Sequence, residues 1–273
     1  MVTGSAAAGQ FRSGVSLVEV FAAVTDDQGR PVADLTAGDF AVEEDGVLQR
    51  IETFIAGELP LAVAIALDRS FSMTQERLAG SVRAVRVFLD ALGPADQVMV
   101  VAIGSETEIL APLSSDRRQA REALDHLTPW GTTPLHDATI AALSAIQAGT
   151  GRRALVLLSD GADRYSVTTA ASLVAQAREM DVQVYPIAFG RDRPPLFAEL
   201  ASVTGGRSMH ATDERQLQRA LTALAAELRV QYLLGYTPEP RTSADDVSGW
   251  RSIRVRVNRV GTRVRARDSY VAR

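Results

Sequence analysis

Hydrophobic positions along the chain follow two different rhythms. In the first 58 residues, short apolar stretches are separated by turn signals at residues 26–31 and 44–46. Residues 47–54 alternate between two sets of side chains, which predicts an arm of a β-hairpin rather than a helix. From Leu59 onward, continuous apolar runs alternate with stretches of helical spacing, which is the pattern of an α/β fold with a parallel sheet.

The α/β stretch predicts six strands and six helices. The strands cover residues 59–67, 97–103, 107–110, 153–158, 182–189 and 208–211. The helices cover about residues 74–92, 116–127, 135–148, 166–180, 195–203 and 214–228. If the sheet is doubly wound in the Rossmann-like order 3-2-1-4-5-6, its first and fourth strands are neighbours at the topological switch point.

After residue 229 the chain returns to short strands, at 230–236, 252–257 and 263–267. We expect the last two to form a hairpin with its turn at Gly261, and residues 238–248 to form a polar loop. The β-rich ends, 12–58 and 230–273, are predicted to form one small discontinuous β-sandwich. A doubly wound α/β domain, residues 59–229, is then inserted between its two halves.

Composition excludes several kinds of chemistry. The 273 residues carry a net charge of −4 and contain no cysteine, and all 29 basic residues are arginine. This rules out disulfides, zinc–thiolate sites, cysteine nucleophiles, Schiff-base lysines and a Walker-type lysine. No apolar run approaches the ~20 residues of a membrane span, and residues 1–14 lack the apolar core of a signal peptide.

Candidate chemistry begins where the apolar run of residues 61–67 stops at Asp68. Ser70 and Ser72 follow at alternate positions, so three side-chain oxygens on one short loop could bind a hard cation. The same stretch also fits a polar turn that caps a helix starting near Thr74. This stretch alone leaves both interpretations open.

Two further residues favour the cation. Asp160 follows the predicted fourth strand, so its carboxylate and that of Asp68 would share one crevice. Thr133, on the loop before the preceding helix, can reach the same place. Two neighbouring carboxylates repel each other unless a cation lies between them, and oxygen ligands of this kind suit Mg²⁺ better than zinc or copper.

These residues resemble the metal-ion-dependent adhesion site of von Willebrand factor type A (VWA) domains. The three parts of that site occur here in the family's order, as Asp68-x-Ser70-x-Ser72, Gly131-Thr132-Thr133-Pro134-Leu135 and Ser159-Asp160-Gly161. The resemblance implies Mg²⁺ or Mn²⁺ bound directly by Ser70, Ser72 and, in an open state, Thr133. Asp68 and Asp160 would act mostly through water. One metal position is left for an acidic group of a protein partner.

The flanking segments resemble a bacterial subgroup of this family, often called VWFA-related. The similarity lies in residues 24–46 of the leader and in residues 232–236 and 267–270 of the tail. Members of that subgroup are generally exported, which implies an extracytoplasmic location, periplasmic or secreted. The resemblance as a whole implies a protein-binding module without catalysis of its own, and the alternative is an assembly subunit whose metal only stabilises the loops.

Two residues beside the candidate site depart from the family or stand out. Phe71 occupies a position where a small residue is common, and it could pack under the loop or project toward a ligand; packing is the favoured interpretation. Trp130 is either an anchor for its loop or a contact on the rim, and anchoring is favoured. Thr132 is a second candidate for the role assigned to Thr133.

Other functions find less support. A Mg²⁺-dependent phosphatase of the haloacid dehalogenase type would need a second Asp where Ser70 stands, and usually a lysine. A serine hydrolase would need a Gly-x-Ser-x-Gly elbow, and a dinucleotide site a glycine-rich turn after the first strand. Arginines between residues 251 and 273 alternate with apolar residues, which favours the solvated face of a hairpin over a nucleic-acid surface.

Overall fold

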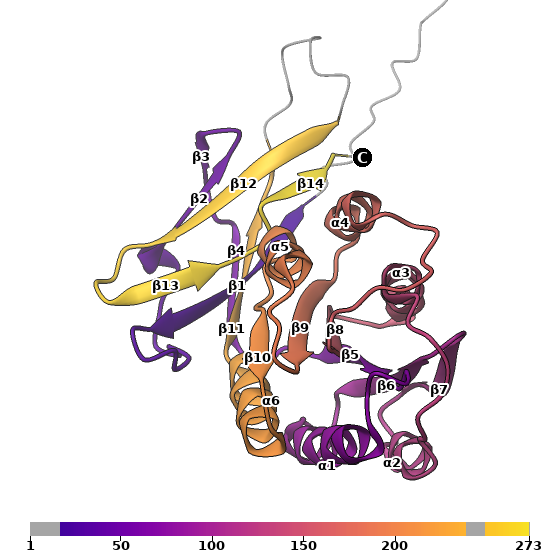
Figure 1. Ribbon diagram of the computed structural model, residues 1–273. Coiled ribbons are helices and arrows are strands. Elements are labelled where there is room, and N and C mark those ends of the chain that lie inside the picture. The colour runs from indigo at the N-terminus through magenta and orange to yellow at the C-terminus, as the bar shows by residue number, and fades with distance from the viewer. Residues whose placement is uncertain (1–16, 239–248, 273) are drawn as a thin grey trace, which may run out of the picture.

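The computed structural model describes residues 17–238 and 249–272. These residues form a six-stranded sheet flanked by helices and two four-stranded antiparallel sheets (Figure 1). Residues 12–16 of the predicted sandwich, Arg273 and most of the predicted polar loop, 239–248, lie outside the described residues. Within the described ranges, no helix is both long and apolar enough to cross a membrane.

The six-stranded sheet has the predicted doubly wound order. Its strands lie side by side as β10 (Met209–Ala211), β9 (Gln183–Phe189), β8 (Arg152–Ser159), β5 (Leu61–Asp68), β6 (Gln97–Ile103) and β7 (Thr107–Ser114). Neighbours are parallel except for β6 and β7, which are antiparallel. The first and fourth strands of this unit, β5 and β8, pair directly, with Leu67 opposite Leu158.

Helices cover both faces of this sheet (Figure 1). One face carries α1 (Gln75–Ala91), α2 (Arg118–Asp125) and α6 (Glu214–Arg229). The other carries α3 (Leu135–Ala145), which continues into a 3-10 turn at Ile146–Ala148, together with α4 (Ala170–Glu179) and α5 (Pro195–Thr204). All eight residues of β5 are buried, with Ile65 in one core and Ala66 in the other. Burial on both faces explains the unalternated apolar run.

The β-rich ends of the chain pair with each other. One sheet contains β13 (Thr262–Arg265), β1 (Val18–Asp26), β11 (Gln231–Tyr236) and β4 (Thr53–Gly57), in that order. The other contains β14 (Ser269–Val271), β12 (Trp250–Val257), β2 (Phe40–Glu44) and β3 (Val47–Gln49), and a 3-10 turn at Ala37–Asp39 precedes β2. The two sheets share one apolar core, in which Val20 of β1 and Val42 of β2 are fully buried.

Two sequence predictions about these strands are wrong. Residues 47–54 do not form one hairpin arm, because β3 ends at Gln49 and the chain enters the other sheet as β4. β12 and β13 do not pair as a hairpin either, since β12 lies between β14 and β2 whereas β13 pairs with β1. Alternation with a period of two identifies a strand and its faces, but it does not identify the neighbouring strand.

The arginines of the C-terminal strands do not all lie on a solvated face, which differs from the prediction made from their alternation with apolar residues. Arg265 and Arg267 are half-buried and Arg251 is buried. Arg251 pairs with the buried Glu44 of β2, whose Oε2 also accepts hydrogen bonds from the hydroxyls of Tyr236 and Tyr270, each at 2.7 Å. These side chains join the two sheets of the sandwich.

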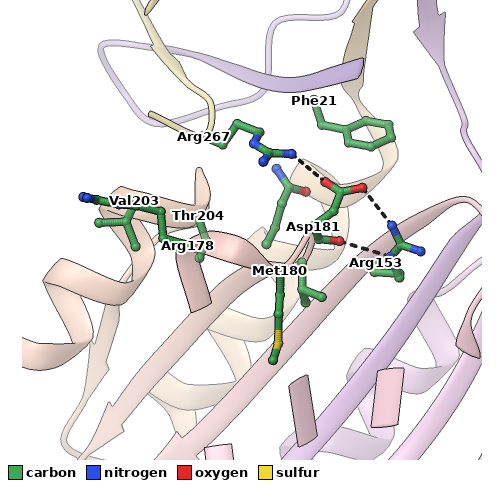
Figure 2. Close-up of a pocket in the computed structure, with 10 residues that line it drawn as sticks. Phe21, Arg153, Arg178, Met180, Asp181, Val203, Thr204 and Arg267 are labelled. Carbon is green, nitrogen blue, oxygen red and sulfur yellow. Dashed lines mark hydrogen bonds and ion pairs between the residues drawn. The ribbon is translucent and has the colours of Figure 1, made fainter. Parts of the chain in front are cut away.

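Ion pairs also join the sandwich to the α/β unit. Asp181, just after α4, pairs with Arg153 of β8 at 2.8 Å and with Arg267 of the C-terminal segment at 3.2 Å (Figure 2). Glu227 of α6 is buried and pairs with Arg265 of β13 at 2.8 Å. Charged side chains of both units therefore meet at this junction. They line a small cavity of about 20 Å³, which has room for about one water molecule, and a wider groove of about 660 Å³.

Candidate functional site

Asp68 ends strand β5 at the carboxyl edge of the six-stranded sheet. Its side chain is fully buried. Oδ1 accepts a hydrogen bond from the backbone N–H of Ser70 at 2.9 Å, and Oδ2 accepts one from the hydroxyl of Ser159 at 2.6 Å. Because Ser159 is the last residue of β8, these bonds hold the Asp68 carboxylate at the switch point between the two strands.

In the loop after Asp68, the residue that caps helix α1 is not one of the two serines. Thr74 is the N-cap of α1, and its hydroxyl accepts a hydrogen bond from the N–H of Arg77 at 3.3 Å. The hydroxyls of Ser70 and Ser72 are not used in this cap, and they hydrogen-bond to each other at 3.0 Å. The structure therefore contains the capped turn and, in addition, a pair of hydroxyls next to the buried carboxylate.

Thr133 lies on a loop that contacts the loop of the serines. Its side chain is buried, and its carbonyl accepts a hydrogen bond from the N–H of Arg164 at 2.7 Å. The preceding Gly131 has a φ of 81°, and a Cβ there would lie 2.4 Å from the Ser105 hydroxyl. Only glycine fits this turn. Gly131 also accepts a hydrogen bond from the N–H of Phe71 at 3.1 Å.

Asp160 begins the loop after β8 and is half-buried. Its Oδ1 accepts a hydrogen bond from the N–H of Ala162 at 3.0 Å. The intervening Gly161 has a φ of 82°, and a Cβ there would lie 2.0 Å from Pro194. The glycine thus allows the chain to turn sharply, which keeps Asp160 at the sheet edge beside Ser159.

The structure therefore brings the predicted residues to one edge, on three loops joined by backbone hydrogen bonds. The loop of Ser70 and Ser72 is bonded to the loop of Thr133, and that loop is bonded to the one that follows Asp160. These bonds form between protein groups alone.

Burial is the main electrostatic feature of the site. Removal from water raises the pKa of Asp68 above its ordinary value, and the negative charge of Asp160 adds to this rise. The hydrogen bonds from Ser159 and Ser70 act in the opposite direction, but burial has the larger effect. A cation next to Asp68 would favour its ionised form.

The residues fit a small divalent cation through their hydroxyl groups. Adjacent ligands of an octahedral Mg²⁺, each ~2.0–2.1 Å from the metal, are ~2.9 Å apart, and the Ser70 and Ser72 oxygens are 3.0 Å apart. Within the described ranges, no three His, Cys, Asp or Glu side chains gather in a way that could hold a metal. The candidate site has only two carboxylates, so it would depend on serine and threonine oxygens.

Sequence reasoning missed the positioning role of Ser159 and Ser105. Ser159 donates to Asp68, and Ser105 accepts a hydrogen bond from the N–H of Thr132 at 3.1 Å. The place of Ser159 directly before Asp160, at the end of a strand neighbouring Asp68, could have indicated its role. Ser105 carries no comparable signal.

The two aromatic residues beside the site differ in their packing. The prediction that Phe71 packs under its loop is wrong, because 71% of its surface is exposed. Trp130 is 41% exposed, and its ring lies against Gly104 and 5.1 Å from the Arg69 guanidinium. Trp130 therefore anchors its loop, as predicted, and also has an exposed face.

Comparisons with known proteins agree with this architecture. The family model described as von Willebrand factor type A domain matches residues 63–162. A von Willebrand factor type A structure from Catenulispora acidiphila aligns with a TM-score of 0.56 at 16% identity, covering 96% of this chain and 75% of that chain. A search among curated proteins found no match.

Two other structures match a smaller share of this chain. The conserved hypothetical protein BatB from Bacteroides thetaiotaomicron aligns with a TM-score of 0.51 at 21% identity, over 61% of this chain and 98% of that chain. The vWF domain of the type V pili tip protein Mfa5 from Porphyromonas gingivalis aligns with a TM-score of 0.50 at 14% identity, over 62% and 94%. The α/β unit of this chain therefore has the von Willebrand factor type A fold, and the family model of that domain matches residues 63–162 within it.

Proposed function

We propose that this protein is a metal-ion-dependent protein-binding module. VWA domains commonly mediate protein–protein interaction. The observation that carries the proposal is the pair of hydroxyls of Ser70 and Ser72, 3.0 Å apart beside a buried carboxylate. A Mg²⁺ or Mn²⁺ ion bound there would have one position for a carboxylate of a protein partner, from Asp, Glu or a C-terminus.

Each candidate residue has a distinct role in this proposal. Ser70, Ser72 and Thr133 would bind the cation directly through their hydroxyl oxygens. Asp68 and Asp160 would act mostly through water and supply the negative charge that attracts the cation. The support for Asp68 in an indirect role is that both of its oxygens already accept hydrogen bonds from the protein.

The proposed role is adhesion or recognition without catalysis. One structural neighbour is the tip protein of a pilus and another is a minor pilin from Streptococcus sanguinis, so this fold occurs in proteins of bacterial surface fibres. We extend that setting to this chain and propose an extracytoplasmic location. Fractionation of the producing cells tests it, and recovery in the cytoplasm would contradict it.

The alternative role is an assembly subunit in which the metal only stabilises the loops. Backbone hydrogen bonds from Phe71 to Gly131 and from Arg164 to Thr133 already join these loops. This arrangement favours a cation that recruits a ligand. A pull-down with wild-type protein and Asp68→Ala separates the two roles: loss of a specific partner supports binding, and unchanged partners favour the assembly role.

Thermal unfolding tests the metal site itself. At a concentration one hundred times the dissociation constant, a ligand stabilises the folded state by about 2.7 kcal/mol, which corresponds to a rise of roughly 5–10 °C in Tm. We expect Mg²⁺ or Mn²⁺ to raise the Tm of the wild type and not that of Asp68→Ala. Asp192→Ala, which removes an exposed carboxylate from the neighbouring β9–α5 loop, should keep the rise. Equal shifts in all three proteins would contradict the assignment.

A further inference from the structure

Large apolar side chains are exposed on the three loops that carry the candidate ligands. Phe71 is 71% exposed, Tyr165 80% and Val167 94%, while Trp130 keeps one exposed face. These are four of the eleven large hydrophobic side chains that are exposed in the described part of the chain. Such a concentration on one edge indicates a contact surface, because isolated exposed apolar residues are common but grouped ones are not.

The exposure of these side chains is built into the loops. The N–H of Phe71 donates to Gly131 at 3.1 Å, and the N–H of Val167 donates to the Asp137 carboxylate at 2.8 Å. Thr168 donates to the same carboxylate at 3.0 Å. Hydrogen bonds thus fix the backbones of Phe71 and Val167 in conformations that leave both side chains exposed to solvent.

Tyr165 adds a second kind of observation. Its φ is 72°, a region that favours glycine and that bulky residues rarely adopt. A large aromatic side chain thus occupies a strained position and points into solvent, next to Arg164, whose N–H is bonded to Thr133. Strain of this kind is concentrated at functional sites.

We propose that the partner presents its metal-binding carboxylate within an apolar segment, with aromatic or aliphatic residues on both sides of the acidic one. This inference rests on the proposed metal site and specifies its partner. Phe71 lies between Ser70 and Ser72, so its ring would contact the residue on one side of the acid. Tyr165 and Val167, on the loop that follows Asp160, would contact the other side. An acidic polysaccharide or a nucleic acid offers no apolar side chains to this rim.

Selection from a peptide library tests the proposal directly. A displayed library of seven-residue peptides with Asp fixed at the centre is captured on the full chain in Mn²⁺ and eluted with EDTA. We expect the positions next to Asp to become enriched in aromatic and aliphatic residues. The selected peptides are then titrated against wild type, the double variant Phe71→Ser/Tyr165→Ser, and Val260→Ser, a fully exposed apolar residue on the distant β12–β13 turn.

The double variant should bind the selected peptides at least tenfold more weakly, while Val260→Ser should bind them like the wild type. Flanking positions that keep the composition of the library, a lack of EDTA-eluted peptides, or equal binding by the double variant would overturn the proposal. The Mn²⁺-dependent rise in Tm separates this failure from failure of the proposed function. A double variant that keeps the rise has an intact metal site, whereas a wild type without any rise has none.

Discussion

At the scale of single residues, the site consists of the buried carboxylate of Asp68 and the nearby hydroxyls of Ser70 and Ser72, neither of which caps helix α1. Asp68 is fixed by Ser159 and by the backbone of Ser70, and Thr74 alone caps α1. Burial of an ionisable group without a paired cation is costly. The ionised form of Asp68 therefore destabilises the folded state, and a bound cation would offset this destabilisation.

Asp68→Asn tests that penalty. Because the pKa of Asp68 is raised in the folded state, its unfolded value being about 3.9, the folded state binds the proton more tightly. This stabilisation is present below that unfolded value and is lost as the pH rises through the raised pKa. We expect metal-free Asp68→Asn to lose less stability than wild type between about pH 4 and 7, measured by thermal unfolding in EDTA. An identical pH dependence of the two proteins would contradict the account.

Tyr165→Gly tests the strain at the rim. A left-handed conformation costs a bulky residue about 1–2 kcal/mol, whereas glycine adopts it without penalty. Val167→Gly is the matched control, since Val167 is also exposed and has no positive φ. We expect Tyr165→Gly to be about 1 kcal/mol more stable than Val167→Gly in chemical denaturation. Equal stability would show that the backbone at Tyr165 is not strained.

At the scale of elements, helix α6 connects the VWA domain to the sandwich. Strand β11 begins two residues after the helix ends, and Glu227 in its last turn pairs with Arg207 at 3.3 Å and with Arg265 at 2.8 Å. The carbonyl of Leu228 accepts a hydrogen bond from the buried Arg152 of β8. The end of α6 is therefore held by both the sheet and the sandwich.

Glu227→Ala measures this anchoring. Removing one partner of a buried ion pair leaves charges without compensation and costs about 3–5 kcal/mol, and we expect roughly 2–4 kcal/mol here because both arginines are partly exposed. Glu58→Ala is the control, since it breaks the exposed ion pair, 2.5 Å long, between Glu58 and Arg229, the last residue of α6. That variant should lose less than about 1 kcal/mol. Similar losses in both variants would contradict the anchoring role of Glu227.

At the scale of the whole molecule, the two ends of the chain flank the VWA domain in sequence and pair with each other in the sandwich. Strands from the N-terminal segment pair with strands from the C-terminal segment in both sheets, as β1 with β11 and β2 with β12. The ion pairs of Asp181 and Glu227 then join the sandwich to the domain. We expect the two units to unfold together.

Two tryptophans report on the units separately, because Trp130 lies in the VWA domain and Trp250 in β12. The variants Trp130→Phe and Trp250→Phe each leave one fluorescent reporter. In each variant, we expect the thermal transition measured by tryptophan fluorescence to coincide with the transition measured by circular dichroism. Transitions of the two reporters several degrees apart would show that the sandwich and the VWA domain unfold independently.

Sequence patterns predict the central sheet better than the sandwich, for a physical reason. Fully buried parallel strands such as β5 have long apolar runs, and the doubly wound order follows from their connections. This order is enough to predict that Asp160 lies beside Asp68. Short strands that alternate carry no information about their neighbours, so the separate sheets of β12 and β13 could not be predicted. The partner of Arg265 was also missed, because Glu227 is distant in sequence.

The exposed position of Phe71 could not be derived from sequence either. A single apolar residue between two serines has no periodicity that assigns it to a core or to solvent. Its position depends on the hydrogen bond from its N–H to Gly131, on a loop that is 60 residues away in sequence. The departure from the family at this position was visible in the sequence, but its consequence was visible only in the structure.

A crystal structure grown with Mn²⁺ and measured for anomalous scattering tests the central claim most directly. We predict one anomalous peak bonded to the hydroxyl oxygens of Ser70 and Ser72, beside Asp68 and Asp160, with one coordination position filled by water or by an acidic group from outside the chain. Absence of a peak at these residues would contradict the metal site. A peak whose coordination is closed entirely by this chain's own oxygens would contradict the role in ligand binding.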